Sequence, residues 1–82
     1  MTISTDDVRR LLQTEDKDAI LVMVEGRIEV IGAGALASDK YRGALEVISR
    51  EDLVSRVGRD PSERALTEQA SILDAAVSEL GG

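Results

Sequence analysis

Hydrophobic positions change their spacing along the chain, and these changes predict a succession of helices and strands. In Thr5–Gln13 the apolar residues recur at helical spacing behind a capping Ser or Thr. Ala19–Val24 is an unbroken apolar run of strand length. Arg27–Ile31 alternates apolar and polar residues, and Glu25-Gly26 before it has the composition of a tight turn. We therefore expect an N-terminal helix followed by a β-hairpin.

Residues 39–57 allow two interpretations. Ala44–Ile48 has the composition of a strand, with Leu45 and Val47 pointing inward. A single helix through residues 39–57 also fits the spacing of the apolar positions. An interior glycine and two neighbouring β-branched residues favour the strand. We expect this strand to be followed by a short helix, which begins after a capping sequence at Ser49 and ends at a glycine.

The last third of the chain predicts a longer helix. Asp60 is a suitable cap, Pro61 suits the first helical position, and Glu63 follows the cap by three residues. The helix is expected to continue to about Leu80. Its apolar stripe includes Leu66, Leu73, Val77 and Leu80. This stripe packs in part on the chain's own sheet, and we expect another part of it to contact a second copy of the chain.

Together these elements predict a single α+β domain over residues 1–82, in the order α-β-β-β-α-α. A small, mainly antiparallel sheet of three strands is expected to pack against helices. The strand at Ala19–Val24 is apolar on both faces, whereas one layer of short helices covers only one. We therefore expect an uncovered sheet face or edge, which is where a partner would bind.

Composition limits the chemistry that the chain can perform. The 82 residues include no Cys and no His, and Tyr41 is the only aromatic. Disulfides, thiolate or imidazole metal sites and His-dependent catalytic triads are therefore excluded. We expect no enzyme activity, no cofactor and no metal. A short chain without disulfides, a metal or a large aromatic core commonly gains stability by oligomerisation, which favours a homodimer.

Charge and hydropathy narrow the possible partners. The net charge of −6 and the isoelectric point near 4.5 disfavour nucleic acid as a partner. The longest apolar run is the six-residue segment Ala19–Val24, which is too short to cross a membrane. Since cysteine is also absent, we expect a cytoplasmic protein.

The charge is unevenly distributed. Residues 40–59 contain five Lys or Arg and three Asp or Glu, a net charge of +2 within an acidic chain. Arg50, Arg56 and Arg59 lie on or near one short predicted helix. They could contact an acidic partner or, weakly, nucleic acid. The simpler interpretation is a solvated face on which the arginines pair with nearby carboxylates, namely those of Glu51, Asp52 and Glu63.

Two neighbouring features are candidates for ligand binding. Gly32 and Gly34 follow a strand in a G-x-G-x-x-A sequence, as in loops that approach a dinucleotide pyrophosphate. A further glycine interrupts the helix that such a site requires, so a turn with small residues packed on the sheet is the competing interpretation. Lys40, Tyr41 and Arg42 could stack a ring and hold a phosphate, or simply cover the core and solvate the loop.

These observations favour a non-catalytic protein–protein interaction module that forms a homodimer. The alternative is a small-ligand protein that binds phosphate or a nucleotide through the loop from Gly32 to Arg42.

Overall fold

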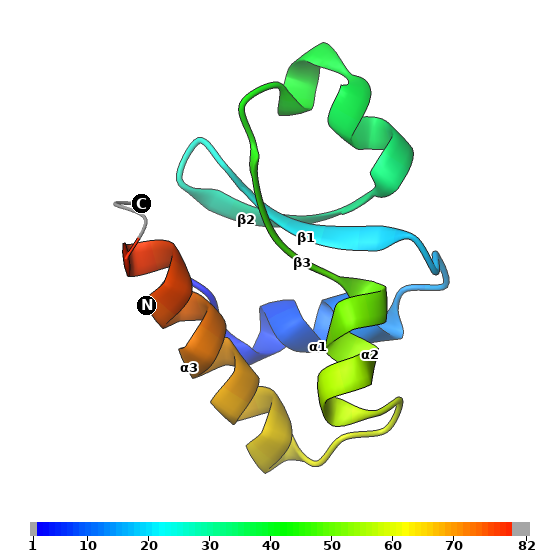
Figure 1. Cartoon of the computed structure of the whole chain (residues 1–82), viewed down its shortest axis with the longest axis vertical. Helices are drawn as coiled ribbons and strands as arrows, with labels where there is room; N and C mark the ends of the chain where they lie inside the picture. Colours follow the sequence, from blue (N-terminus) through cyan, green and yellow to red (C-terminus); the bar gives the residue numbers. More distant parts are fainter. Residues whose placement is uncertain (1, 80–82) are drawn as a thin grey trace.

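Figure 1 shows the computed structural model of the chain, which describes residues 2–79. The elements in chain order are α1 (Thr5–Gln13), β1 (Ala19–Val24), β2 (Arg27–Gly32), the 3-10 helices η1 (Ala33–Ala37) and η2 (Asp39–Tyr41), β3 (Leu45–Ser49), α2 (Arg50–Val57) and α3 (Glu63–Glu79). This arrangement confirms the α+β fold and the order α-β-β-β-α-α. It also confirms the strand followed by a helix within residues 39–57.

The sheet has the strand order β2-β1-β3, and β1 pairs antiparallel with both neighbours. Leu21 lies opposite Ile48 and Val22 lies opposite Glu46, so Val47 is an extra residue of β3 and shifts the register there. Leu45 and Val47 are half-buried and pack against the main core, as predicted, and Ile48 is the most deeply buried residue of β3.

One side of the sheet carries all three α-helices (Figure 1). At the start of α1 the Ser4 hydroxyl accepts the Asp7 N–H, and the Asp7 carboxylate accepts the Ser4 N–H, so the two residues form a capping box. The apolar face of α1 then enters a core that it shares with β1 and the other helices. The largest fully buried side chains of this core are Ile3, Val8, Leu11, Leu21 and Leu53.

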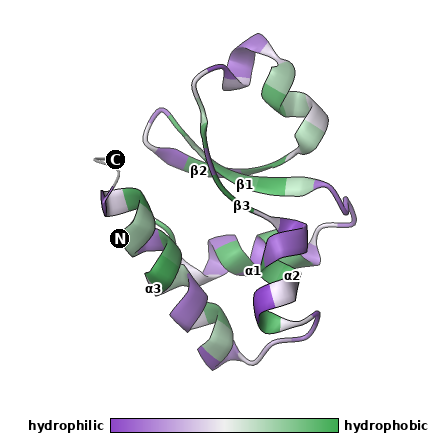
Figure 2. Ribbon diagram, in the orientation of Figure 1, coloured by the Kyte–Doolittle hydropathy of each residue, from purple (hydrophilic) through white to green (hydrophobic). Residues whose placement is uncertain are grey.

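The other side of the sheet is covered by the segment of residues 33–44, which lies opposite the helices in Figure 1. The buried side chains Ile20, Val22 and Ile31 form a second, smaller cluster, on which the partly buried Leu36 and Tyr41 pack. The prediction of an uncovered sheet face is therefore wrong, because the small residues of the segment fold into two 3-10 helices over β1. In Figure 2 most of β1 accordingly appears hydrophobic between these two layers.

Serine side chains set the starts of the two later helices. The Ser49 hydroxyl accepts a backbone N–H from the first turn of α2, and Gly58 ends that helix with a φ of 81° that suits glycine. The last helix begins at Glu63 rather than at the proline. The Ser62 hydroxyl accepts the N–H of the residue three positions later, so Ser62 takes the capping role predicted for Asp60.

Candidate functional site

The two glycines of the predicted ligand loop lie in different surroundings. Gly32 is the last residue of β2, and a Cβ there would lie 2.8 Å from Oδ2 of Asp16. Gly34 lies in η1, where an added Cβ would meet no atom within 4 Å. A Cβ at position 32 would therefore require the Asp16 carboxylate to move, whereas position 34 has room for a side chain.

The polar groups of the same loop bond to other parts of the chain. The Tyr41 hydroxyl donates to Oε1 of Glu29 at 2.9 Å, and this bond lowers the pKa of the Glu29 carboxyl. Nζ of Lys40 lies 5.4 Å from the centre of the Tyr41 ring, at cation–π distance. Arg42 pairs with Asp39 at 2.7 Å. The structure thus brings Lys40 and Tyr41 together, and phosphate or nucleotide binding by this loop stays a prediction.

The apolar stripe of α3 packs inside the chain. Leu66, Leu73 and Val77 are at most 5% exposed and belong to the helix-side core. Leu80, the fourth residue predicted at an interface, lies outside the described residues. Ile72, at 53% exposed, is the one large hydrophobic side chain that is exposed within residues 2–79. A second copy could contact α3 as it stands only through the face that carries Ile72.

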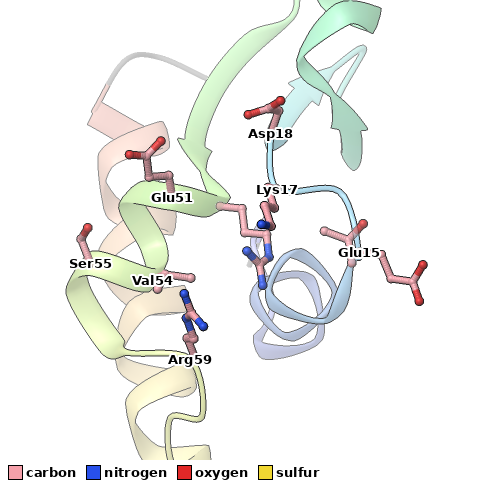
Figure 3. Close-up of a pocket in the computed structure, with 9 residues that line it drawn as sticks. Glu15, Lys17, Asp18, Glu51, Val54, Ser55 and Arg59 are labelled. Carbon is pink, nitrogen blue, oxygen red and sulfur yellow. The ribbon is translucent and has the colours of Figure 1, made fainter.

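A cavity of about 580 Å³ lies where the end of α1 and the loop after it meet α2 (Figure 3). Three cationic side chains line it: Lys17 from the loop, Arg50 from the first turn of α2, and Arg59 from the residues after α2. A guanidinium or ammonium group binds oxyanions, and arginine does so through a planar fork of N–H groups. This cavity is the place within the described structure where the cations gather.

The hydrogen-bond donors of Arg50 are only partly paired at this site. Its Nη2 donates to the backbone carbonyl of Leu12, near the end of α1, over a long distance of 3.4 Å. Its Nε is buried and has no hydrogen-bond partner among residues 2–79. A buried donor without a partner costs about 1–3 kcal/mol. Such an uncompensated group commonly marks a place where a ligand, ion or water completes the bonding.

None of the three cations forms an ion pair within the described part of the chain. Five other arginines do so: Arg9, Arg10, Arg27, Arg42 and Arg64. The interpretation that Arg50, Arg56 and Arg59 pair with nearby carboxylates is therefore wrong. Glu63, one of the expected acceptors, binds Arg9 instead and thereby raises the pKa of that guanidinium.

Comparison with known protein families, with curated proteins and with solved structures finds no match to this chain. Within residues 2–79, no cluster of three or more carboxylates is arranged to hold a metal ion. In the same part of the chain, no helix is both long and apolar enough to cross a membrane. The arrangement of side chains in the structure is therefore the basis for inferring a function.

The cavity was not predicted from the sequence because its lining comes from separate segments. The basic excess of residues 40–59 was visible and includes Arg50 and Arg59. Lys17 stands in a stretch with more acidic than basic residues, and only the packing of α1 beside α2 brings it to the same cavity.

Proposed function

We propose that the chain is a non-catalytic interaction module that forms a homodimer by edge-to-edge pairing of β3. The observation that carries this proposal is an apolar patch on the helix side of the sheet. Its members, all half-buried, are Met23, Ile28, Val30, Leu45 and Val47. The patch reaches the outer strand β3, which pairs only with β1 in the described sheet. A free strand edge beside apolar side chains is a template for pairing with another strand.

The two sheet edges differ in charge, and this difference favours β3. The edge strand β2 carries Arg27 and Glu29, which pair with each other at 3.0 Å. Charged side chains on an edge strand oppose pairing with another chain. Glu46 is the only charged residue of β3. The β3 edge therefore offers the weaker barrier to a second strand.

A second copy of the chain is the occupant that this edge suits. An antiparallel pair of identical strands is related by a two-fold axis, so each copy presents the same residues to the other. If the axis passes beside Val47, Glu46 of one copy lies opposite Ile48 of the other, and the two carboxylates do not oppose each other. The chain lacks disulfides and has one aromatic residue, so added apolar burial would stabilise it.

We expect the dimer to be weak. The apolar patch has five residues, whereas a standard interface uses about 20–30 residues from each side. Dissociation in the micromolar range would correspond to about 8 kcal/mol at a 1 M standard state. The compartment that we propose is the cytoplasm, with partners that are proteins rather than nucleic acid or membrane. The acidic composition and the absence of cysteine support this choice.

Sedimentation equilibrium on the purified chain tests the dimer. We expect the native chain to associate with a dissociation constant of roughly 10 µM. Val47→Lys introduces charge at the β3 edge and should yield a monomer. Ile72→Lys introduces the same charge at an exposed aliphatic residue of α3, outside the apolar patch, and is the control, which should still dimerise. Circular dichroism confirms that both variants are folded.

A native chain that remains monomeric at about 200 µM, well above the expected dissociation constant, would contradict the proposal. Loss of the dimer in Ile72→Lys with its retention in Val47→Lys would place the interface on α3 instead.

A further inference from the structure

The three cations of the cavity are not neutralised by the carboxylates beside them. Glu15, Asp18 and Glu51 also line the cavity, yet none lies within 4.0 Å of Lys17, Arg50 or Arg59 in the described chain. Figure 3 shows the three carboxylates turned outward, away from the centre of the cavity. The cations and the carboxylates thus line the same opening without pairing with each other within the described chain, and Arg50 is the least exposed of the cations.

The guanidinium group of Arg50 has hydrogen-bond donors that residues 2–79 do not fully pair. The unpartnered Nε is buried, and the bond from Nη2 to the Leu12 carbonyl, at 3.4 Å, is at the upper limit of the distance range. A small rotation of the side chain toward the cavity would replace these weak interactions with charge-assisted bonds to an oxyanion. An anion in the cavity would thus relieve the cost of the orphaned donor.

We propose that this cavity binds a small organic molecule through a phosphate monoester group. A phosphate monoester carries nearly two negative charges at neutral pH and has three acceptor oxygens, which match two guanidinium groups and one ammonium group. About 580 Å³ lies within the range of small-molecule pockets and leaves room for an organic part beside the phosphate. The side chain of Val54 supplies an apolar wall for that part.

A small ligand fits this site better than a polyanion does. The chain has a net charge of −6, and Glu15, Asp18 and Glu51 surround the opening, so a nucleic acid strand would be repelled along most of its length. A single phosphate that enters the cavity passes these carboxylates and contacts the cations directly. The cavity begins at Arg50, directly after the end of β3, but none of its lining residues belongs to β3, and the inference does not rest on the dimer.

The test is a titration of the ¹⁵N-labelled chain with inorganic phosphate and with glycerol 3-phosphate, followed by NMR at constant ionic strength set with sodium chloride. We expect saturable shifts of the backbone amides of Lys17, Arg50 and Arg59, and of the Arg50 Nε–H. Glycerol 3-phosphate should bind more tightly than inorganic phosphate, because its organic part adds contacts within the cavity. Malonate, a dicarboxylate of similar charge, should bind more weakly than either.

Charge-matched variants separate the site from general attraction between charges. Arg50→Gln and Arg59→Gln should each weaken binding of glycerol 3-phosphate by about tenfold or more. Arg56→Gln removes the same charge from the same helix, but Arg56 donates to Gln69 outside the cavity. It should therefore leave binding within about twofold of the native chain. Val47→Lys should also bind normally, because Val47 does not line the cavity.

Three outcomes would overturn the inference. The first is an absence of saturable shifts in the folded native chain. The second is an equal loss of binding in Arg56→Gln and Arg50→Gln, which would indicate an adventitious ion only. The third is binding of inorganic phosphate or malonate as tight as that of glycerol 3-phosphate, which would exclude an organic phosphate as the ligand. Because Arg59 is exposed, Arg59→Gln keeps the test valid even if Arg50→Gln fails to fold.

Discussion

The two sides of the sheet are covered by different kinds of structure. On one side, three α-helices bury large aliphatic side chains such as Leu11, Leu21 and Leu53 with no measurable exposure. On the other side, two 3-10 helices place the partly buried Leu36 and Tyr41 over a small cluster. The same strand, β1, supplies buried residues to both sides. The first layer is held by regular helices and a continuous core, and the second by a short segment with few buried residues of its own.

This difference predicts two levels of stability within one chain. Regions with few buried apolar contacts open at a lower free energy than the core. Residues 33–44 contribute partly buried side chains and none that is fully buried. The segment is therefore expected to open while the helix side remains folded. We therefore expect the cover of residues 33–44 to open locally, while the helices stay packed on the other face of the sheet.

Leu21→Ala should have the largest effect, because it removes a fully buried side chain from the helix side. We expect a loss of about 3–4 kcal/mol, within the range of buried Leu→Ala substitutions. A chain of this length has a total stability of about 4–12 kcal/mol, so the substitution removes from a quarter of the stability to nearly all of it. Urea denaturation followed by far-ultraviolet circular dichroism measures the loss. A cost below about 1 kcal/mol would mean that the helix-side core is not the main source of stability.

Leu36→Ala is the same substitution on the other side and should cost only about 1 kcal/mol, because Leu36 is partly exposed. The chain has no Trp and one Tyr, and Tyr41 lies in the second layer, so tyrosine fluorescence reports on that layer. We expect the fluorescence transition of this variant to occur at lower urea than the circular dichroism transition. Coincident transitions would show that the two layers unfold together.

Local patterns predicted the helix side well. The bounds of α1 and β1 follow from apolar spacing and from a polar cap before the helix, both of which act over a few residues. The start of α3 was misplaced because Asp60 and Ser62 are both capable caps. The choice between them depends on how the chain turns after Gly58, which is set by tertiary packing.

Long-range packing accounts for what the sequence did not predict. The segment of residues 33–44 has a composition typical of a loop, and its cover over β1 depends on contacts with distant strand residues. The irregular pairing at Val47 is likewise a property of two strands together. The cavity with Lys17, Arg50 and Arg59 assembles from three separate segments, so no short motif records it.

Tyr41→Phe should have the smallest effect on stability, since it removes one hydroxyl and leaves the ring in the second layer. The hydroxyl donates to Glu29 and lowers the pKa of that carboxyl below its ordinary 4.5. A carboxyl whose pKa is lower in the folded state than in the unfolded state stabilises the fold when the pH is above its unfolded-state pKa. This stabilisation is lost as the pH falls through the lower, folded-state pKa. The variant should therefore be less stable than the native chain at pH 7, and the difference should shrink as the pH falls below 4.5.

NMR titration of the Glu29 carboxyl gives the direct measurement. In Tyr41→Phe the pKa of Glu29 should rise toward 4.5, but not reach it, because Arg27 still pairs with the carboxylate at 3.0 Å. Arg27→Gln is the companion variant, which removes the ion pair and keeps the tyrosine bond. Since the tyrosine bond is the larger cause of the lowered pKa, Tyr41→Phe should raise the pKa more than Arg27→Gln does. An unchanged pKa of Glu29 in Tyr41→Phe would mean that the second layer is not anchored to β2 through the Tyr41 hydroxyl.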